Sequence, residues 1–244
     1  MPKVSVIIPA AGAGKRFGGD AKKPFTALDG RPIFIRCVEL FINRADVCQT
    51  ILTVAPEDHE VVREKYAANI MIMGIKLVKG GAERYESVRL ALEAVDPQAD
   101  LVCIHDGVRP CVFEHWIDAA FEKAAQTGAT ILAAPLTGTI KRVDAKQVIR
   151  ETVPRSGLFE AQTPQVFARE LIQSAYAKLP ADSRPTDDAE VAALAGHAVS
   201  IILTDARNIK ITHPGDLPLA SSILAGMAKK AKGGPRGAFE EAQW

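Results

Sequence analysis

The stretch "VSVIIPAAGAGKRFGG", residues Val4–Gly19, decides how the fold of this chain is interpreted. It begins with a run of Val and Ile that ends at Ile8 and is typical of a buried β-strand. From Pro9 onward the side chains become small, and Lys15 and Arg16 then add two positive charges. Small residues let backbone N–H groups approach a ligand closely, so the stretch indicates a strand that leads into an anion-binding loop.

Strand and helix patterns alternate along most of the chain. Apolar runs predict strands at residues 3–8, 49–55, 75–80, 100–106, 129–135 and 198–204. Apolar residues at helical spacing, or helix-start residues, predict helices at residues 31–42, 56–67, 88–95 and 215–230. This alternation predicts an α/β fold with a Rossmann-like, mostly parallel sheet and helices on both faces.

The carboxyl ends of the predicted strands form the expected binding edge, because ligands of such sheets bind there. Four segments should meet at that edge: the loop after Ile8, the Gly80–Gly81 turn, the loop after Ile104 and the end of the strand at 129–135. The unusual residues of the sequence lie in these segments, which supports the interpretation.

Residues 137–165 break the alternation. Lys141–Val143 and Val148–Arg150 flank the short polar segment 144–147, which predicts a β-hairpin. We expect a protruding arm at about 137–156 that reaches a second subunit; the alternative is an antiparallel ribbon at the edge of the main sheet. The rest of residues 1–230 is expected to form one domain, and residues 231–244 a disordered tail.

The charge balance excludes some classes of partner. The chain has 244 residues, with 30 Lys and Arg against 29 Asp and Glu, and a net charge of +1. A nucleic acid is therefore not expected as a partner, and a phosphate ligand would need a local cluster of cations. Because no apolar run approaches the length of a membrane span, we expect no membrane contact either.

The four cysteines form no C-x-x-C pair. Cys37, Cys48 and Cys103 have apolar neighbours, and we expect them to be small buried hydrophobes with reduced thiols. Reduced thiols and an N-terminal strand pattern in place of a signal peptide predict a cytoplasmic protein.

Three phosphate-binding patterns compete for the glycine-rich loop. A P-loop would need Gly at Pro9 and Ser or Thr at Arg16, and a dinucleotide loop would need Gly at Phe17. The nucleotidyltransferase pattern P-A-A-G-x-G-x-R fits, and Lys23 follows it. A simple connecting turn would explain the glycines but not the two cations, which could neutralise charge that develops in a transition state.

The chain resembles the 2-C-methyl-D-erythritol 4-phosphate cytidylyltransferase family, and the resemblance extends to about Ala225. Besides the first loop, it rests on the segments "GGAERYESVRLAL", "VCIHDGVRPCV", "PLTGTIKR", "ETVPRSGLFEAQTPQVF", "RPTDDAEVA" and "DARNIKITHPGDL". It implies transfer of CMP from CTP to 2-C-methyl-D-erythritol 4-phosphate, with Mg²⁺ held chiefly through substrate phosphates. A ribitol 5-phosphate cytidylyltransferase shares almost every motif and stays open as an alternative.

The resemblance also implies roles for individual residues. Catalytic cations would be Arg16, Lys23 and Lys210. The nucleotide would contact Ala10, Ala11, Gly12, Gly14, Gly80, Gly81, Arg84 and Ser87. The acceptor would contact Asp106, Arg109, Thr163 and Thr186 of one subunit, with Thr139 and Arg155 from the arm of the other subunit of a homodimer. Asp106 is the candidate metal ligand.

Structural interpretations of the same residues remain open. Asp106 and Arg109 could form an ion pair that holds their loop, and Thr186 could be a helix N-cap. Asp188 stands where the family usually has Glu and is expected at a cap or loop, while His105 receives no role. A nucleotide-binding module without activity is the candidate from another class. Cations from separate loops favour an enzyme over it.

Overall fold

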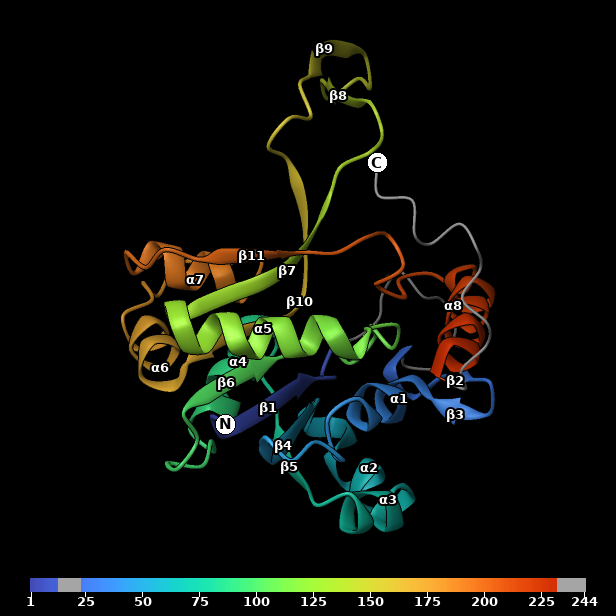
Figure 1. Ribbon diagram of the computed structural model, residues 1–244, viewed down its shortest axis with the longest axis vertical. Coiled ribbons are helices and arrows are strands. Elements are labelled where there is room, and N and C mark those ends of the chain that lie inside the picture. The colour runs from blue at the N-terminus through green and yellow to red at the C-terminus, as the bar shows by residue number, and fades with distance from the viewer. Residues whose placement is uncertain (13–22, 232–244) are drawn as a thin grey trace.

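The computed structural model describes residues 1–12 and 23–231 (Figure 1). Its centre is a sheet of seven strands: β1 Val4–Pro9, β4 Val47–Val54, β5 Ile75–Lys79, β6 Leu101–Ile104, β7 Ala129–Pro135, β10 Phe159–Ala168 and β11 Ser200–Leu203. The spatial order is β11-β7-β10-β6-β1-β4-β5. All six predicted strands are therefore present in one sheet.

The sheet is parallel except for β10. β1 pairs in parallel with β4 and β6, β4 with β5, and β11 with β7. β10 lies between β6 and β7 and is antiparallel to both. The mostly parallel sheet is thus confirmed, but the sequence analysis missed β10, because its buried middle carries Gln162, Thr163 and Gln165 in place of an apolar run.

Helices cover both faces of the sheet, as predicted. One face carries α1 Ile33–Glu39, α2 His59–Lys65, α3 Ala67–Ile72 and α5 Glu114–Thr127. The other face carries α4 Arg84–Leu92, α6 Arg169–Ala177 and α7 Asp188–Leu194. Alternate residues of β1 enter different cores: Val6 and Ile8 belong to the first and Ile7 to the second, as the two-residue period of a strand requires.

A third apolar cluster attaches the C-terminal helix. α8 Asp216–Ala231 packs its Ala220 with Ile33 and Cys37 of α1 and with Leu28 of a small ribbon. That ribbon consists of β2 Ala27–Leu28 and β3 Arg31–Pro32 and follows the short helix η1 Lys23–Phe25. Of the expected tail, only Ala231, the last residue of α8, is described.

The hairpin forms an arm. Among the described residues, β8 Ile140–Val143 and β9 Ile149–Val153 pair only with each other, in a separate two-stranded sheet. Figure 1 shows this sheet projecting from the body on the two segments that leave β7 and enter β10. The protruding hairpin is therefore confirmed, and the edge-ribbon alternative is wrong. That the arm reaches a second subunit stays a prediction.

Two further expectations need correction. The helix predicted at 56–67 is divided into η2 Pro56–Asp58 and α2, and α3 follows after a break at Tyr66. Cys48 is exposed on β4, whereas Cys37 and Cys103 are buried as predicted; all four thiols are free. Among the described residues, no helix has the length and apolar character that crossing a bilayer requires.

Candidate active site

Two adjoining cavities lie at the edge of the sheet where β1 and β6 end. The larger has a volume of about 430 Å³ and the smaller about 200 Å³. Arg84, Asp106 and Lys210 line both cavities, and we call these three residues the shared wall. The wall joins the first turn of α4, the loop after β6 and the loop before α8. Two ligands that occupied the two cavities would therefore meet at this wall.

The cavities bring together most of the predicted site residues. Besides the wall, the larger cavity is lined by Ala10, Ala11, Gly12, Lys23, Gly81 and Ser87. The smaller one adds Arg109, Thr163 and Thr186. Thr139 and Arg155 lie on the exposed arm and line neither cavity; the Arg155 guanidinium donates to the Thr137 carbonyl. Gly14 and Arg16 lie outside the described residues.

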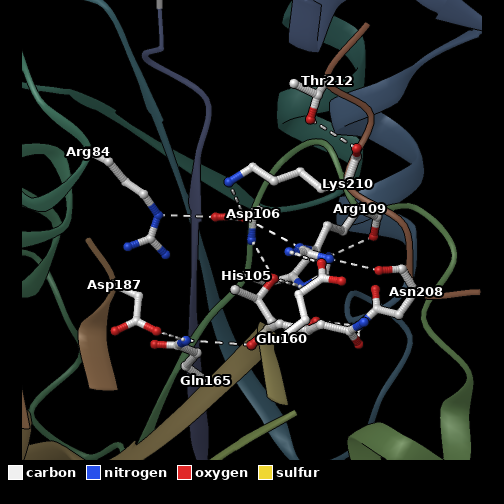
Figure 2. A network of polar contacts seen from close by, with 12 residues as sticks. Arg84, His105, Asp106, Arg109, Glu160, Gln165, Asp187, Asn208, Lys210 and Thr212 are labelled. Atoms are coloured by element: carbon white, nitrogen blue, oxygen red, sulfur yellow. Dashed lines mark hydrogen bonds and ion pairs between the residues drawn. The ribbon is translucent and has the colours of Figure 1, made fainter. Parts of the chain in front are cut away.

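The Asp106 carboxylate is the centre of the charge network (Figure 2). Its Oδ1 accepts a hydrogen bond of 3.1 Å from Arg84 Nε, and its Oδ2 lies 2.8 Å from Lys210 Nζ and 3.5 Å from Arg109 Nε. The Asp106 side chain is only 8% exposed. Burial alone would raise the pKa of this carboxyl, but Arg84, Lys210 and Arg109 hold that pKa well below its usual range.

Arg109 is more deeply buried than the other two cations, with 5% of its side chain exposed. Its Nη1 donates a 2.7 Å hydrogen bond to the Asn208 carbonyl, and Glu160 lies 3.9 Å from its Nη2. The position of Arg109 is compatible with both roles considered for it. Its ion pair with Asp106 holds the loop, and its side chain also lines the smaller cavity, where it can contact a ligand.

His105, to which the sequence analysis assigned no role, connects the loop after β6 to β10 through hydrogen bonds of its buried ring. Its ring lies 3.0 Å from the Arg109 carbonyl through Nε2 and 3.1 Å from Thr163 Oγ1 through Nδ1. A carbonyl can only accept, so Nε2 carries the proton and Nδ1 accepts from the Thr163 hydroxyl. The Thr163 oxygen is then free to accept the 3.0 Å bond from the Asp106 backbone N–H. Burial lowers the pKa of His105 to about 4.

This low pKa predicts an acid-sensitive stability. Because His105 is neutral in the folded protein and has a pKa near 6.5 when unfolded, protonation favours the unfolded chain. The free energy of unfolding should be fully retained above pH 6.5 and fall by about 3 kcal/mol as the pH drops to 4. Urea unfolding at several pH values would measure this slope. His105→Gln should flatten it, and the exposed His213→Gln should keep it; equal slopes for both variants would contradict the assignment.

The Gly80–Gly81 turn fits closely against the first cavity. Ser87 is buried, and its Oγ accepts a 3.0 Å bond from the Gly81 N–H and donates at 3.1 Å to the Glu83 carbonyl. Glu83 and Glu86 cap α4 reciprocally, which fixes where the helix begins. A Cβ at Gly80 would lie 2.7 Å from both Ala11 Cβ and Ser87 Oγ. Only glycine therefore lets the turn contact the loop after β1.

Gly80→Ala should accordingly impair both the turn and the site. The extra methyl group must displace Ala11 or break the Ser87 hydrogen bonds, and such overpacking costs about 1–3 kcal/mol of stability. Thermal unfolding would be measured together with the affinity for CTP, the nucleotide that the resemblance implies. Both the stability and the affinity should decrease. Gly226→Ala in α8 meets nothing within 4 Å and should leave both quantities unchanged or raise stability slightly. Wild-type behaviour of Gly80→Ala would show that the close contact is unimportant.

Several expectations about the smaller cavity were wrong or incomplete. Asp187, not Thr186, is the N-cap of α7, because its side chain accepts from the Glu190 N–H. The Thr186 hydroxyl instead donates to the Glu190 carboxylate at 2.9 Å. Asp188, expected at a cap or loop, is completely buried in the first turn of α7.

Besides Thr163 and Lys210, which were predicted, β10 and the loop after β11 carry polar residues that the sequence analysis missed. Asn208 donates from Nδ2 to Gln162 Oε1 at 2.9 Å and to the Thr163 carbonyl at 3.0 Å. Gln165 Oε1 accepts from the Asp188 backbone N–H at 3.0 Å. Besides the loops already named, β10 contributes Ala161, Thr163 and Gln165 to the cavity lining, and the loop after β11 contributes Lys210 and Thr212. The end of β7, which the sequence analysis had expected at the site, lines neither cavity. The only sequence signal was the polar run "QTPQ" beside an apolar "VF" pair.

The residues do not form a magnesium cage of their own. Asp106 is the one carboxylate of the shared wall, and its oxygens already face three cations. Within residues 1–12 and 23–231, no group of three His, Cys, Asp or Glu side chains is placed to hold a metal ion. The donor set therefore suits a magnesium ion that keeps several waters and is bound by phosphate oxygens of a ligand.

A mostly parallel α/β sheet, with a small-sided loop and cations converging at its strand ends, defines a protein of the nucleotidyltransferase class. Within that class, the family model described as IspD, 2-C-methyl-D-erythritol 4-phosphate cytidylyltransferase, matches residues 4–226. The chain belongs to this family, and the resemblance inferred from its motifs is confirmed.

Individual relatives agree with the family match. Proteins named 2-C-methyl-D-erythritol 4-phosphate cytidylyltransferase from Rhodopirellula baltica and Halalkalibacterium halodurans are 44% and 41% identical to the chain. These alignments cover 91% of this chain, and 94% and 96% of the two relatives. The crystal structure of the enzyme of that name from Thermus thermophilus superposes with a TM-score of 0.76 at 29% identity, over 91% of this chain and 99% of the other.

Proposed function

We propose that the chain transfers CMP from CTP to 2-C-methyl-D-erythritol 4-phosphate, giving 4-diphosphocytidyl-2-C-methyl-D-erythritol and pyrophosphate. The observation that carries this proposal is the pair of adjoining cavities with one charged wall between them. A group transfer needs its two substrates side by side, with reacting atoms close to groups that neutralise charge. Family membership supplies the identity of both substrates.

The larger cavity would hold the nucleotide. Ala10, Ala11 and Gly12 directly follow β1 and have small side chains, so their backbone can lie against the triphosphate. Lys23 lines the same cavity, and its positive charge would interact with the phosphates. The turn at Gly80 and Gly81 would face the base. Arg16 and Gly14 are assigned to the phosphates by their places in the motif alone.

The smaller cavity would hold the acceptor. Arg109 and Lys210 offer positive charge for its phosphate group. The hydroxyl oxygens of Thr163 and Thr186, whose protons are donated to His105 and Glu190, can accept hydrogen bonds from a polyol. An oxygen of the acceptor phosphate attacks the α-phosphorus of CTP, a new P–O bond forms, and the bond to the β-phosphate breaks with pyrophosphate as the leaving group. Lys23, Lys210 and Arg16 would neutralise the developing charge, so catalysis consists of positioning and electrostatics.

Mg²⁺ completes this proposal. When bound to the phosphate oxygens of CTP it would supply further charge neutralisation. Because both oxygens of Asp106 are occupied by cations, we assign the ion primarily to the nucleotide. A cytoplasmic location is likewise proposed, in keeping with the four free thiols.

Pyrophosphate release with CTP and Mg²⁺ tests the proposal. We expect turnover with 2-C-methyl-D-erythritol 4-phosphate and none with ribitol 5-phosphate. Lys210→Ala should lower kcat/KM by about 100-fold or more, because it removes a preorganised cation, whereas the exposed Asp182→Asn should not change it. Turnover with ribitol 5-phosphate alone would replace the acceptor. CTP binding without turnover on either acceptor would favour the nucleotide-binding module.

We further propose that the arm completes the acceptor cavity of a second copy in a homodimer. Thr139 and Arg155 are exposed and line neither cavity of their own chain. The arm and its base also expose Val148, Ile149 and Phe159, with 52%, 59% and 40% of each residue accessible. Apolar surface on a projecting ribbon suits burial against another protein surface. A crossed arrangement would place both polar residues beside the partner's acceptor.

Mixing two inactive variants distinguishes a crossed arm from a free one. Arg155→Ala damages only the arm, and Lys210→Ala damages only the body, so each homodimer should be nearly inactive. In a heterodimer, one of the two sites combines an intact body with an intact arm. Unfolding and refolding an equal mixture should therefore restore about a quarter of the wild-type activity. No recovery, with dimers present by light scattering, would show that each arm serves its own subunit.

A further inference from the structure

Arg84 is held between two carboxylates, Asp106 of the shared wall and Asp188 of α7. Its Nε donates to Asp106 Oδ1 at 3.1 Å, and its Nη2 donates to Asp188 Oδ2 at 2.8 Å. Asp188 lies in the first turn of α7, more than a hundred residues along the chain from Arg84 (|i−j| = 104). The guanidinium thus links α7 to Asp106 in the loop after β6. Because it is planar and rigid, it fixes both distances at once.

Asp188 is built into this position. It is 0% exposed, and its second oxygen accepts a 2.6 Å hydrogen bond from the Tyr176 hydroxyl of α6. Its backbone N–H is held by Gln165 of β10. A buried carboxylate is costly unless it is paired and hydrogen-bonded, and here Arg84 and Tyr176 supply both requirements. The carboxylate therefore has little freedom to move, and neither does the guanidinium bound to it.

We propose that Asp188, supported by Tyr176, is a positioning residue that holds Arg84 against Asp106 and thereby orients the cations of the acceptor cavity. The proposal rests on the proposed function. It also changes the role that the family resemblance implied for Arg84, which was contact with the nucleotide. Two of its three guanidinium nitrogens are bound to carboxylates, so Arg84 braces the wall and is not primarily a nucleotide ligand.

Loss of the Asp188–Arg84 contact should weaken binding of the acceptor more than binding of CTP. Asp106 Oδ2 faces both Arg109 and Lys210, the cations that line the acceptor cavity. If Arg84 lost Asp188, its charge could turn from Asp106 toward a substrate phosphate, and the carboxylate that anchors the other two cations would be released. The nucleotide cavity also has backbone walls at residues 9–12 and 81–83, which do not depend on this contact.

Asp188→Asn tests the proposal in the full-length protein. The KM for 2-C-methyl-D-erythritol 4-phosphate should rise about tenfold, while the KM for CTP should stay within about twofold. A smaller folded fraction lowers the apparent kcat but cannot change either KM, so this split separates positioning from mere stabilisation. The dissociation constant of the acceptor, measured by calorimetry, should rise in parallel and does not require turnover. Asp182→Asn, an exposed change in the loop before α7, is the matched control.

Coupling to Arg84 gives the decisive comparison. Once Arg84→Gln has removed the cation, adding Asp188→Asn should cause no further rise in the acceptor KM. If Asp188→Asn does not fold, Tyr176→Phe takes its place, because it keeps the charge and removes one hydrogen bond; a rise of about threefold is expected, again only when Arg84 is present.

Each remaining outcome has one meaning. An unchanged acceptor KM and dissociation constant in Asp188→Asn, or an equal effect in the Arg84→Gln background, would overturn the proposal. A wild-type protein that binds the acceptor but releases no pyrophosphate would overturn the proposed function. In that case the dissociation constants alone decide about Asp188. A wild-type protein that does not bind the acceptor would overturn both.

Discussion

The buried carboxylate of Asp106 is the interaction on which the rest of the site depends. It draws Arg84, Arg109 and Lys210 from three separate segments onto one group of which only 8% is exposed. Without it, three like charges would face one another across a few ångströms in a poorly solvated wall. With it, they form a compact arrangement with excess positive charge, which is what a phosphate-binding surface requires. The same contact therefore holds the loops together and prepares the site electrostatically.

The antiparallel strand β10 explains why the smaller cavity and the arm lie together. The parallel strands deliver their carboxyl ends to the binding edge, but β10 runs the other way and crosses that edge near its middle, where Gln165 pairs with Ile104 of β6. Thr163 and Gln165 are thereby placed in the lining of the smaller cavity. Because β7 ends and β10 begins beyond this same edge, the connection between them has to leave from beside the site.

Local patterns were enough to predict the fold and part of the site. The alternation of strands and helices, the loop after Ile8 and the Gly80–Gly81 turn each depend on a few neighbouring residues, and the structure brings these loops to one cavity. The residues that were missed act over long separations: Asp188 meets Arg84 104 residues away, and His105 meets Thr163 58 residues away. A buried Asp or His has no local signature, because its partner is chosen by the topology of the sheet. β10 was missed for a related reason, since its buried polar side chains serve partners on other elements.

The three cations of the wall differ in how firmly they are fixed. Arg109 is 5% exposed and bound to a backbone carbonyl, Arg84 is 26% exposed and bound to two carboxylates, and Lys210 is 37% exposed. A guanidinium bound at several nitrogens exchanges partners at a high cost, whereas an ammonium on a flexible stem exchanges one at a low cost. The two arginines thus provide a rigid frame of charge. Lys210 lines both cavities and is the most exposed of the three, so it is the cation that can exchange its partner at the lowest cost. This difference follows from burial and side-chain geometry alone.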